Sequence, residues 1–117
     1  MTEKLVFEIS IPSTRKVKGH TEYQFILITN MPELSSAYTR TYKRYSEILK
    51  LHEKISRAFP KLPEFPGKRW FGKTDPVLIE NRRKLFEAYF NYIFEFIAKN
   101  NLGGECFAKE VFTFFNK

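Results

Sequence analysis

The chain is 117 residues long, which is enough for one domain with a real hydrophobic core. Its residues are 43% hydrophobic and 28% charged, so we expect an ordinary globular protein. No apolar run approaches the ~18 residues needed to span a bilayer, which excludes a membrane-spanning class. The net charge of +7 favours polyanionic partners, either nucleic acid or an acidic membrane leaflet, although a basic protein without a particular partner has the same charge.

Two features of the sequence indicate the cytosol. The N-terminus has no apolar segment of the signal-peptide kind, and the single cysteine, Cys106, cannot form an internal disulfide. The surroundings of Cys106 predict a small core residue. The aromatic share of 17%, with thirteen Phe, predicts a core rich in phenylalanine.

The first part of the chain has the period-two pattern of β-strands. Residues 5–11 alternate apolar and polar side chains and predict a half-buried strand that Pro12 ends, followed by a polar, basic connection over 13–20. Residues 21–29 and 35–42 are rich in β-branched and aromatic side chains and predict two further strands, with a turn over 30–33. Because short connections favour neighbouring antiparallel strands, we expect a three-stranded meander.

The rest of the chain is predicted to be helical. The period changes to about 3.6 at Ser46, the predicted N-cap of an amphipathic helix that Pro60 ends. Residues 60–67 carry proline at every third position and predict an extended loop. Asp75 and Pro76 start a long central helix over 77–98, and a last helix covers 105–115. The predicted fold is α+β: one domain over 1–117, with the antiparallel meander packed against a helical subdomain of three to four helices and a Pro-rich loop.

The junction between the third strand and the first helix carries the run Arg44-Tyr45-Ser46. A helix start exposes unpaired N–H groups and the positive end of the helix dipole, which together favour an anion. An adjacent arginine can form two parallel hydrogen bonds with one phosphate. This junction is therefore a candidate phosphate site; the alternative is a surface arginine beside a core tyrosine.

A second candidate residue is Arg82, which lies on the same helical stripe as Phe86, Tyr89 and Ile93. An arginine on an apolar face needs a partner, because burying an unpaired charge is very costly. A bound anionic ligand would supply that partner. A salt bridge to a glutamate, or a side chain that reaches out to solvent, is the alternative.

The loop after the prolines places Trp70 and Phe71 among cations that include Lys68. Aromatic rings flanked by cations suit the interface of a membrane, and a loop that buries its own rings is the alternative. Lys68 extends the basic surface, or is simply a solvated loop lysine. The segment Pro60–Pro66 contains a PxxP pattern, which SH3-type grooves bind, although a structural proline loop has the same pattern.

The sequence shows no constellation for catalysis. It contains no His/Cys/Asp/Glu cluster with metal-ligand spacing and no Gly-rich phosphate loop. His20 and His52 are the only histidines, and Ser10 and Ser46 have no visible base partner. We therefore expect no enzyme, no metal and no cofactor. Since no recognised nucleic-acid motif accompanies the charge, we expect no nucleic-acid partner.

These features, in this order, resemble the phox-homology (PX) domain, a phosphoinositide-binding module. The resemblance covers essentially the whole chain. It rests on the meander, the segment Arg-Tyr-Ser-Glu-Ile-Leu over 44–49, the Pro-rich loop followed by a lysine, and the long helix with Glu-Asn-Arg-Arg-Lys-Leu-Phe-Glu-Ala-Tyr over 80–89. Two positions depart from the family pattern: Ile48 stands where Phe is usual, and Gly67 separates Pro66 from Lys68.

The resemblance implies roles for individual residues. Arg44 would bind the lipid 3-phosphate, Tyr45 would pack under the inositol ring, and Lys68 would bind the 1-phosphate. Arg82, rather than Arg83, would bond the 4- and 5-hydroxyls.

Three further positions complete the implied site. Ser46 stands where some relatives have a basic residue, and its hydroxyl or amide would donate to the phosphate. Trp70 and Phe71 fall where relatives insert loop side chains into the bilayer.

The resulting hypothesis is a non-enzymatic, sorting nexin-like module that binds phosphatidylinositol 3-phosphate. It would lie peripherally on the cytosolic face of endosomal or vacuolar membranes and act in trafficking. The rival is a protein-interaction domain of the same fold, with weak or no lipid specificity, which recruits a partner through the Pro-rich loop or the helices.

Overall fold

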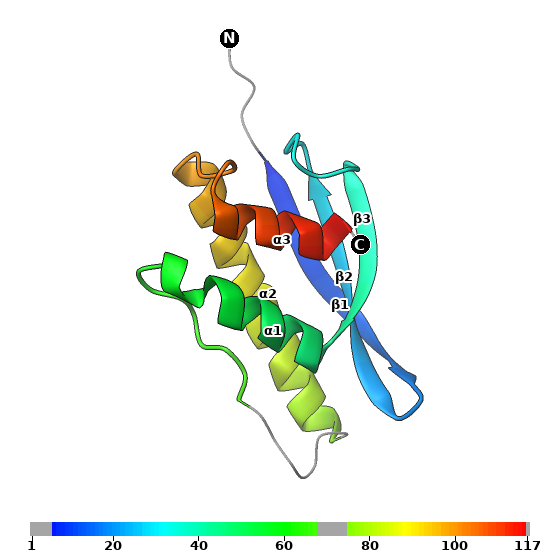
Figure 1. Cartoon of the computed structure of the whole chain (residues 1–117). Helices are drawn as coiled ribbons and strands as arrows, with labels where there is room; N and C mark the ends of the chain where they lie inside the picture. The colour runs from blue at the N-terminus through cyan, green and yellow to red at the C-terminus, as the bar shows by residue number, and fades with distance from the viewer. Residues whose placement is uncertain (1–5, 68–74, 117) are drawn as a thin grey trace.

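Three antiparallel strands form one sheet in the order β1-β2-β3, in a computed structural model that describes residues 6–67 and 75–116 (Figure 1). The strands are β1 (Phe7–Val17), β2 (His20–Thr29) and β3 (Tyr38–Arg44). The helices are α1 (Tyr45–Ile55), a short 3₁₀ helix η1 (Ser56–Ala58), α2 (Pro76–Lys99) and α3 (Cys106–Asn116). The predicted α+β fold, with its meander and helical subdomain, is confirmed.

β1 is longer than the sequence predicts. Pro12 does not end it, because the pairing of β1 with β2 shifts register between Ser10 and Ser13, and such a bulge tolerates the missing N–H of proline. The strand then continues to Val17, which pairs directly with His20. The predicted connection over 13–20 is therefore wrong: most of it is strand.

The hairpin between β1 and β2 closes with only two residues. Lys18 has a φ of 50° and Gly19 a φ of 80°, so both lie in the left-handed region that such tight turns require. Glycine adopts this conformation without strain. The turn fixes the position of His20, the first residue of β2.

β3 begins and ends later than the prediction of 35–42. Residues 30–37 form an ordered connection instead, in which the N–H of Leu34 donates to the carbonyl of Met31 at 3.2 Å. The amide oxygen of Asn116, at the end of α3, accepts from the N–H of Ser35 at 3.0 Å. The connection is therefore held against the last helix at Ser35, and it meets the sheet where the N–H of Thr29 donates to the carbonyl of Ala37 at 3.0 Å.

α1 begins one residue earlier than the predicted cap. Its N-cap is Arg44, not Ser46, because the carboxylate of Glu47 reaches back and accepts from the N–H of Arg44 at 2.9 Å. Ser46 lies exposed in the first turn. At α2 the prediction is confirmed: Asp75 accepts from the N–H of Val77 at 2.9 Å, and Pro76 is the first helical residue.

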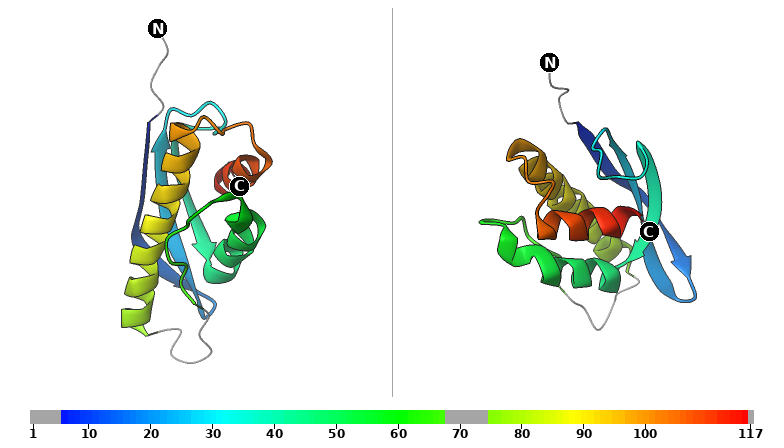
Figure 2. Two further views of the ribbon diagram at one scale, coloured as in Figure 1. Left: turned by 90° about the vertical axis from the view of Figure 1, so that its left-hand side faces the viewer. Right: turned by 45° about the horizontal axis from the view of Figure 1, so that its top comes forward.

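All the helices lie on one side of the sheet, and α1 and α3 lie in front of α2 (Figures 1 and 2). α2 is the central helix, as its wide apolar face predicts. Its buried residues face the sheet and the other two helices; they are Leu78, Arg82, Phe86, Tyr89, Phe90, Ile93, Phe94 and Ile97.

The core is rich in phenylalanine, as the composition predicts. Phe90 is fully buried, and its ring packs edge-on against Phe25 at 5.2 Å and Phe115 at 5.5 Å between centroids. Such edge-to-face pairs stabilise a core beyond their area burial. Phe25 on β2, Phe90 on α2 and Phe115 on α3 thereby join the sheet to two helices.

The prediction for Cys106 is wrong. Cys106 is exposed, because it is the first residue of α3 and lies off the face that this helix buries. That face consists of Ala108, Val111, Phe112 and Phe115.

Truncating the ring of Phe90 should strongly destabilise the domain. We expect Phe90→Ala to lower the free energy of unfolding by about 3–5 kcal/mol, because the substitution leaves a cavity among the rings that pack against Phe90. Urea denaturation followed by circular dichroism measures this loss. Val77→Ala on the same helix is the control; since Val77 is 67% exposed, its effect should stay within about 0.5 kcal/mol. Equal stabilities of the two variants would contradict the assignment of this core.

Candidate functional site

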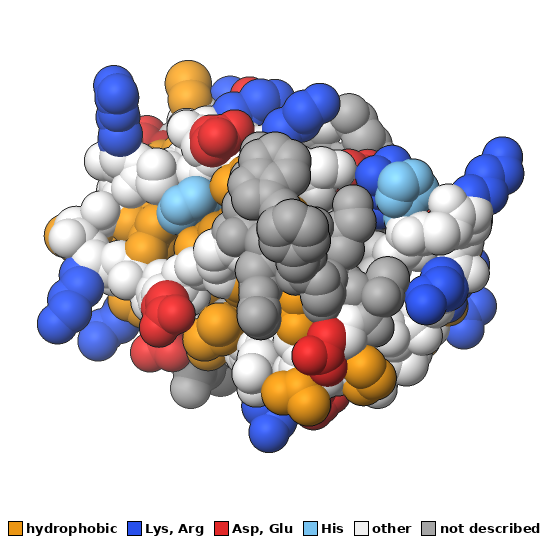
Figure 3. All heavy atoms as spheres, turned by 90° about the horizontal axis from the view of Figure 1, so that it is seen from below, with side chains coloured by type: hydrophobic (Ala, Val, Ile, Leu, Met, Phe, Trp, Pro, Cys, Tyr) orange, Lys and Arg blue, Asp and Glu red, His pale blue; other side chains and the backbone are white. Residues whose placement is uncertain are grey.

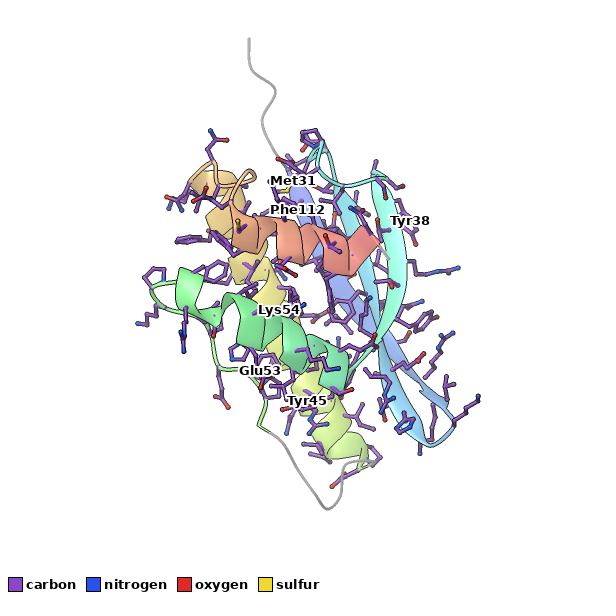
Figure 4. All side chains as sticks on the ribbon, in the orientation of Figure 1. Met31, Tyr38, Tyr45, Glu53, Lys54 and Phe112 are labelled. Atoms are coloured by element: carbon purple, nitrogen blue, oxygen red, sulfur yellow. The ribbon has the colours of Figure 1, made fainter. Side chains whose placement is uncertain are left out.

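Three segments that are distant in sequence meet at the ring of Tyr45. The Tyr45 hydroxyl donates to the carbonyl of Pro66 at 2.6 Å, and its ring packs against Phe65 and Phe86 at centroid distances of 6.0 and 6.2 Å. The guanidinium carbon of Arg82 lies 4.1 Å from the centre of the ring. Figure 4 shows Tyr45 at the start of α1, at the opposite end of the molecule from Met31 and Phe112. The start of α1, the Pro-rich loop and the first turns of α2 therefore form one site.

Arg82 is buried, with 6% of its surface exposed. Within the described part of the chain, its Nη2 donates to the carbonyl of Gly67 at 3.3 Å, while its buried Nε has no hydrogen-bond partner there. Among the described residues, no carboxylate forms an ion pair with Arg82. The salt bridge to a glutamate, which the sequence left as an alternative, is thus absent from this part of the chain. The guanidinium keeps unused donors in a buried place, which is unfavourable unless a ligand accepts from them.

Two tyrosine hydroxyls lie near the charge of Arg82. Burial raises the pKa of the Tyr23 and Tyr45 hydroxyls, and the nearby charge of Arg82 opposes that rise without reversing it. The hydroxyl of Tyr23 is also buried near Arg82, and it makes no hydrogen bond of good geometry with a described residue. Both tyrosines therefore remain protonated at neutral pH, and neither neutralises the arginine.

The neighbouring Arg83, unlike Arg82, forms ion pairs with carboxylates. Its Nη2 lies 2.6 Å from a carboxylate oxygen of Glu80, its Nη1 lies 3.4 Å from Glu87, and Nη1 also donates to the carbonyl of Ile11 at 2.8 Å. The hydrogen bond from Arg83 lowers the pKa of the Glu80 carboxyl. Arg83 thus ties α2 to β1 and is already paired, whereas Arg82 is not.

Arg44 lies at the other side of the junction, directly before Tyr45. Its Nη2 is 3.1 Å from Nδ1 of His20, at the hairpin end of β2. Glu22 is its register partner on β2, but the carboxylate of Glu22 lies 2.7 Å from Nε of Arg15. Within the described ranges, Arg44 forms no ion pair with a carboxylate.

The remaining predicted residues are Ser46, Lys68, Trp70 and Phe71. Ser46 is exposed in the first turn of α1, beside Tyr45. Lys68, Trp70 and Phe71 lie outside the described residues. The structure therefore brings Tyr45 and Arg82 into contact. Arg44 and Ser46 lie near this contact because they are the residues on either side of Tyr45 in the sequence.

The sequence missed the residues that anchor the Pro-rich loop. Phe65 stacks on His52 at 4.2 Å between ring centres, and the Tyr89 hydroxyl lies 2.7 Å from Nδ1 of His52. Burial lowers the pKa of His52. Because Pro66 is also buried, this end of Pro60–Pro66 packs as a structural loop rather than as an exposed proline ridge. The sequence signal for this packing was Phe65, an apolar residue between Pro63 and Pro66.

Seen from below, the surface carries Lys and Arg side chains around its rim, with Asp and Glu among them (Figure 3). The described residues contain no group of three or more His, Cys, Asp or Glu placed to hold a metal ion. Among the described helices, none combines the length and apolarity that crossing a membrane requires.

Comparison with known proteins shows one family. The family model described as "PX domain" matches residues 31–100. Sorting nexin-15 of Homo sapiens is 31% identical over 106 residues, which cover 81% of this chain and 30% of that protein. HCLS1-binding protein 3 of Mus musculus is 31% identical over 96 residues, 68% of this chain and 24% of that protein. The chain thus spans less than a third of these relatives.

Solved structures agree with this match. A designed CISK-PX domain superposes with a TM-score of 0.63 and 25% identity, over 86% of this chain and 93% of that one. The mouse SNX19 PX domain, whose crystal structure holds a sulphate ion, superposes with a TM-score of 0.61 over 93% of this chain and 97% of that one. At 22% sequence identity, this superposition shows a shared fold and nothing more.

Neutral substitution of the two neighbouring arginines should change the free energy of unfolding by different amounts. We expect Arg82→Met to keep the free energy of unfolding within about 1 kcal/mol of the wild type, because the substitution removes a buried charge that has no carboxylate partner. Arg83→Met should lower it by about 1 kcal/mol or more, because a buried carbonyl and two glutamates lose their donor. Chemical denaturation of both variants tests this. A large loss for Arg82→Met alone would mean that its role is structural.

Proposed function

This chain belongs to the PX-domain family, and on that premise we propose that it is a membrane-targeting module that binds phosphatidylinositol 3-phosphate. PX domains bind phosphoinositides, and the relatives of this chain include sorting nexins. The observation that supports the proposal most directly is the buried Arg82, which lies over Tyr45 without a carboxylate partner among the described residues. We also propose that residues 1–117 act as one lipid-binding domain.

Arg82 is proposed to read the inositol ring. A guanidinium has five N–H donors, and among the described residues the hydrogen bond to Gly67 uses one of those of Arg82. The 4- and 5-hydroxyls of an inositol ring would accept from those that remain, above the ring of Tyr45. Additional phosphates at these two positions would obstruct these hydrogen bonds sterically. The proposed selectivity is therefore for a headgroup whose 4- and 5-positions are unphosphorylated.

Arg44 is proposed to bind the 3-phosphate. It caps α1, where the unpaired N–H groups and the helix dipole also favour an anion. Its charge has no ion-pair partner among the described residues, so a phosphate would not have to displace a carboxylate. Ser46 in the first turn would add a hydroxyl or amide donor, and Lys68 would hold the 1-phosphate.

The membrane itself is proposed to provide the rest of the affinity. A net charge of +7 attracts the domain to an anionic leaflet before the headgroup is bound. Trp70 and Phe71 would then insert at the interface and add a few kcal/mol, on the order expected for burying two aromatic rings. This mechanism suits peripheral binding to the cytosolic face of endosomal or vacuolar membranes, in trafficking.

Removing the proposed phosphate ligand should abolish specific binding. We expect Arg44→Ala to weaken binding to vesicles that contain phosphatidylinositol 3-phosphate about a hundredfold, because two charge-assisted hydrogen bonds are lost. Cosedimentation with vesicles that carry each phosphoinositide in turn measures both affinity and selectivity.

The control for this variant is Arg40→Ala. Arg40 is exposed on the same strand and carries the same charge, so its loss should cost about fivefold at most through nonspecific attraction. Binding of Arg44→Ala equal to that of Arg40→Ala would refute the pocket assignment.

Insertion predicts a difference between membrane and soluble ligand. Trp70→Ala should weaken vesicle binding at least tenfold, since the apolar burial is lost, and should leave affinity for a soluble short-chain headgroup unchanged. Isothermal titration with the soluble ligand and cosedimentation with vesicles give the two values. Equal losses in the two assays would remove the insertion from the mechanism.

A further inference from the structure

We infer that His20 is a positioning residue of the lipid site, which holds the guanidinium of Arg44 through a neutral acceptor and so leaves its charge available to a phosphate. This inference rests on the proposed function, because it requires Arg44 to be the phosphate ligand. His20 is far from the junction in sequence and belongs to the β1–β2 hairpin. The hairpin therefore contributes to a site otherwise built from α1, α2 and the Pro-rich loop.

The hydrogen bond between Arg44 and His20 requires one tautomer of the imidazole. Nη2 of Arg44 lies 3.1 Å from Nδ1 of His20. Because a guanidinium can only donate, Nδ1 is the acceptor, and the ring proton lies on Nε2. The contact uses one of the five donors of Arg44. Over residues 6–67 and 75–116 the other four stay unused, which is sufficient for two parallel hydrogen bonds to one phosphate.

The sheet register places a carboxylate next to Arg44, but the two side chains do not form an ion pair. Glu22 is its direct partner across the β2–β3 pair, and His20 lies two residues away on the same face of β2. The carboxylate of Glu22 is instead 2.7 Å from Nε of Arg15, its partner on β1. Arg15 also lies 3.5 Å over the ring of Tyr42, which keeps it on this face. Because the carboxylate of Glu22 is already paired with Arg15, it does not pair with Arg44.

A fixed arginine binds with a smaller entropy cost. A free arginine side chain loses considerable rotamer freedom when it is ordered by a ligand, and pre-ordering reduces that loss. The tight turn at Lys18 and Gly19 sets where His20 stands, and the hydrogen bond then restricts Arg44. A carboxylate in place of His20 would order the side chain equally well but would compete with the phosphate.

The test compares two substitutions of His20. Asn presents an amide oxygen close to the position of Nδ1, whereas Leu has similar bulk and no acceptor. On vesicles with phosphatidylinositol 3-phosphate, we expect His20→Leu to bind roughly five- to tenfold more weakly than the wild type. His20→Asn should bind within about twofold of the wild type. Since His20 is exposed, both variants should keep the wild-type melting temperature.

A second comparison tests the role of Arg15. Arg15→Gln frees Glu22 to pair with Arg44 and should weaken binding more than Lys16→Gln, which removes the same charge from the neighbouring residue. Adding Glu22→Gln to Arg15→Gln removes the competing carboxylate and restores the wild-type net charge. The double variant should therefore bind like the wild type.

The outcomes separate this inference from the function on which it rests. Wild-type binding together with equal binding of His20→Leu would overturn the role of His20 and leave the proposed function intact. Equal weakening by Asn and Leu would also overturn it, because the acceptor would then be irrelevant. If the wild type itself bound no phosphoinositide vesicle, the proposed function would fail first, and the inference with it.

Discussion

The contact between the guanidinium of Arg82 and the ring of Tyr45 is the interaction on which the candidate site depends. It brings the first turns of α2 against the start of α1, and the carbonyls of Pro66 and Gly67 close the arrangement by accepting from these two side chains. A buried cation over an aromatic face is stabilised, but less than by an ion pair. A ligand rich in oxygen acceptors would satisfy the donors of Arg82 that the described residues leave unused.

The aromatic core makes this contact possible. Phe65 packs against Phe86 at 5.7 Å and against Tyr89 at 5.2 Å, so the Pro-rich loop is bound to α2. Tyr45 then packs against both Phe65 and Phe86. Since close-packed interiors transmit displacement, the position of Arg82 is set by the same rings that stabilise the fold. Stability and ligand recognition therefore share residues at this end of the molecule.

The distribution of carboxylates explains why Arg44 and Arg82 are available to a ligand while Arg15 and Arg83 are not. Arg83 is paired with Glu80 and Glu87, and Arg15 is paired with Glu22. Arg82 and Arg44 have a tyrosine ring and a histidine as neighbours instead. Neighbours without a negative charge hold a guanidinium in place without cancelling its charge, which favours the binding of an anion.

The sequence by itself determined the order and type of the elements, because hydrophobic period, turn residues and caps are local signals. It also determined that Arg82 lies on the buried stripe of α2, since helical spacing is local too. Tertiary structure alone decided that β1 passes Pro12 as a bulge, that Cys106 is exposed and that Glu47 moves the cap to Arg44. It alone decided the contact of Arg44 with His20, because strand register and loop packing join residues whose separation in the chain carries no pattern.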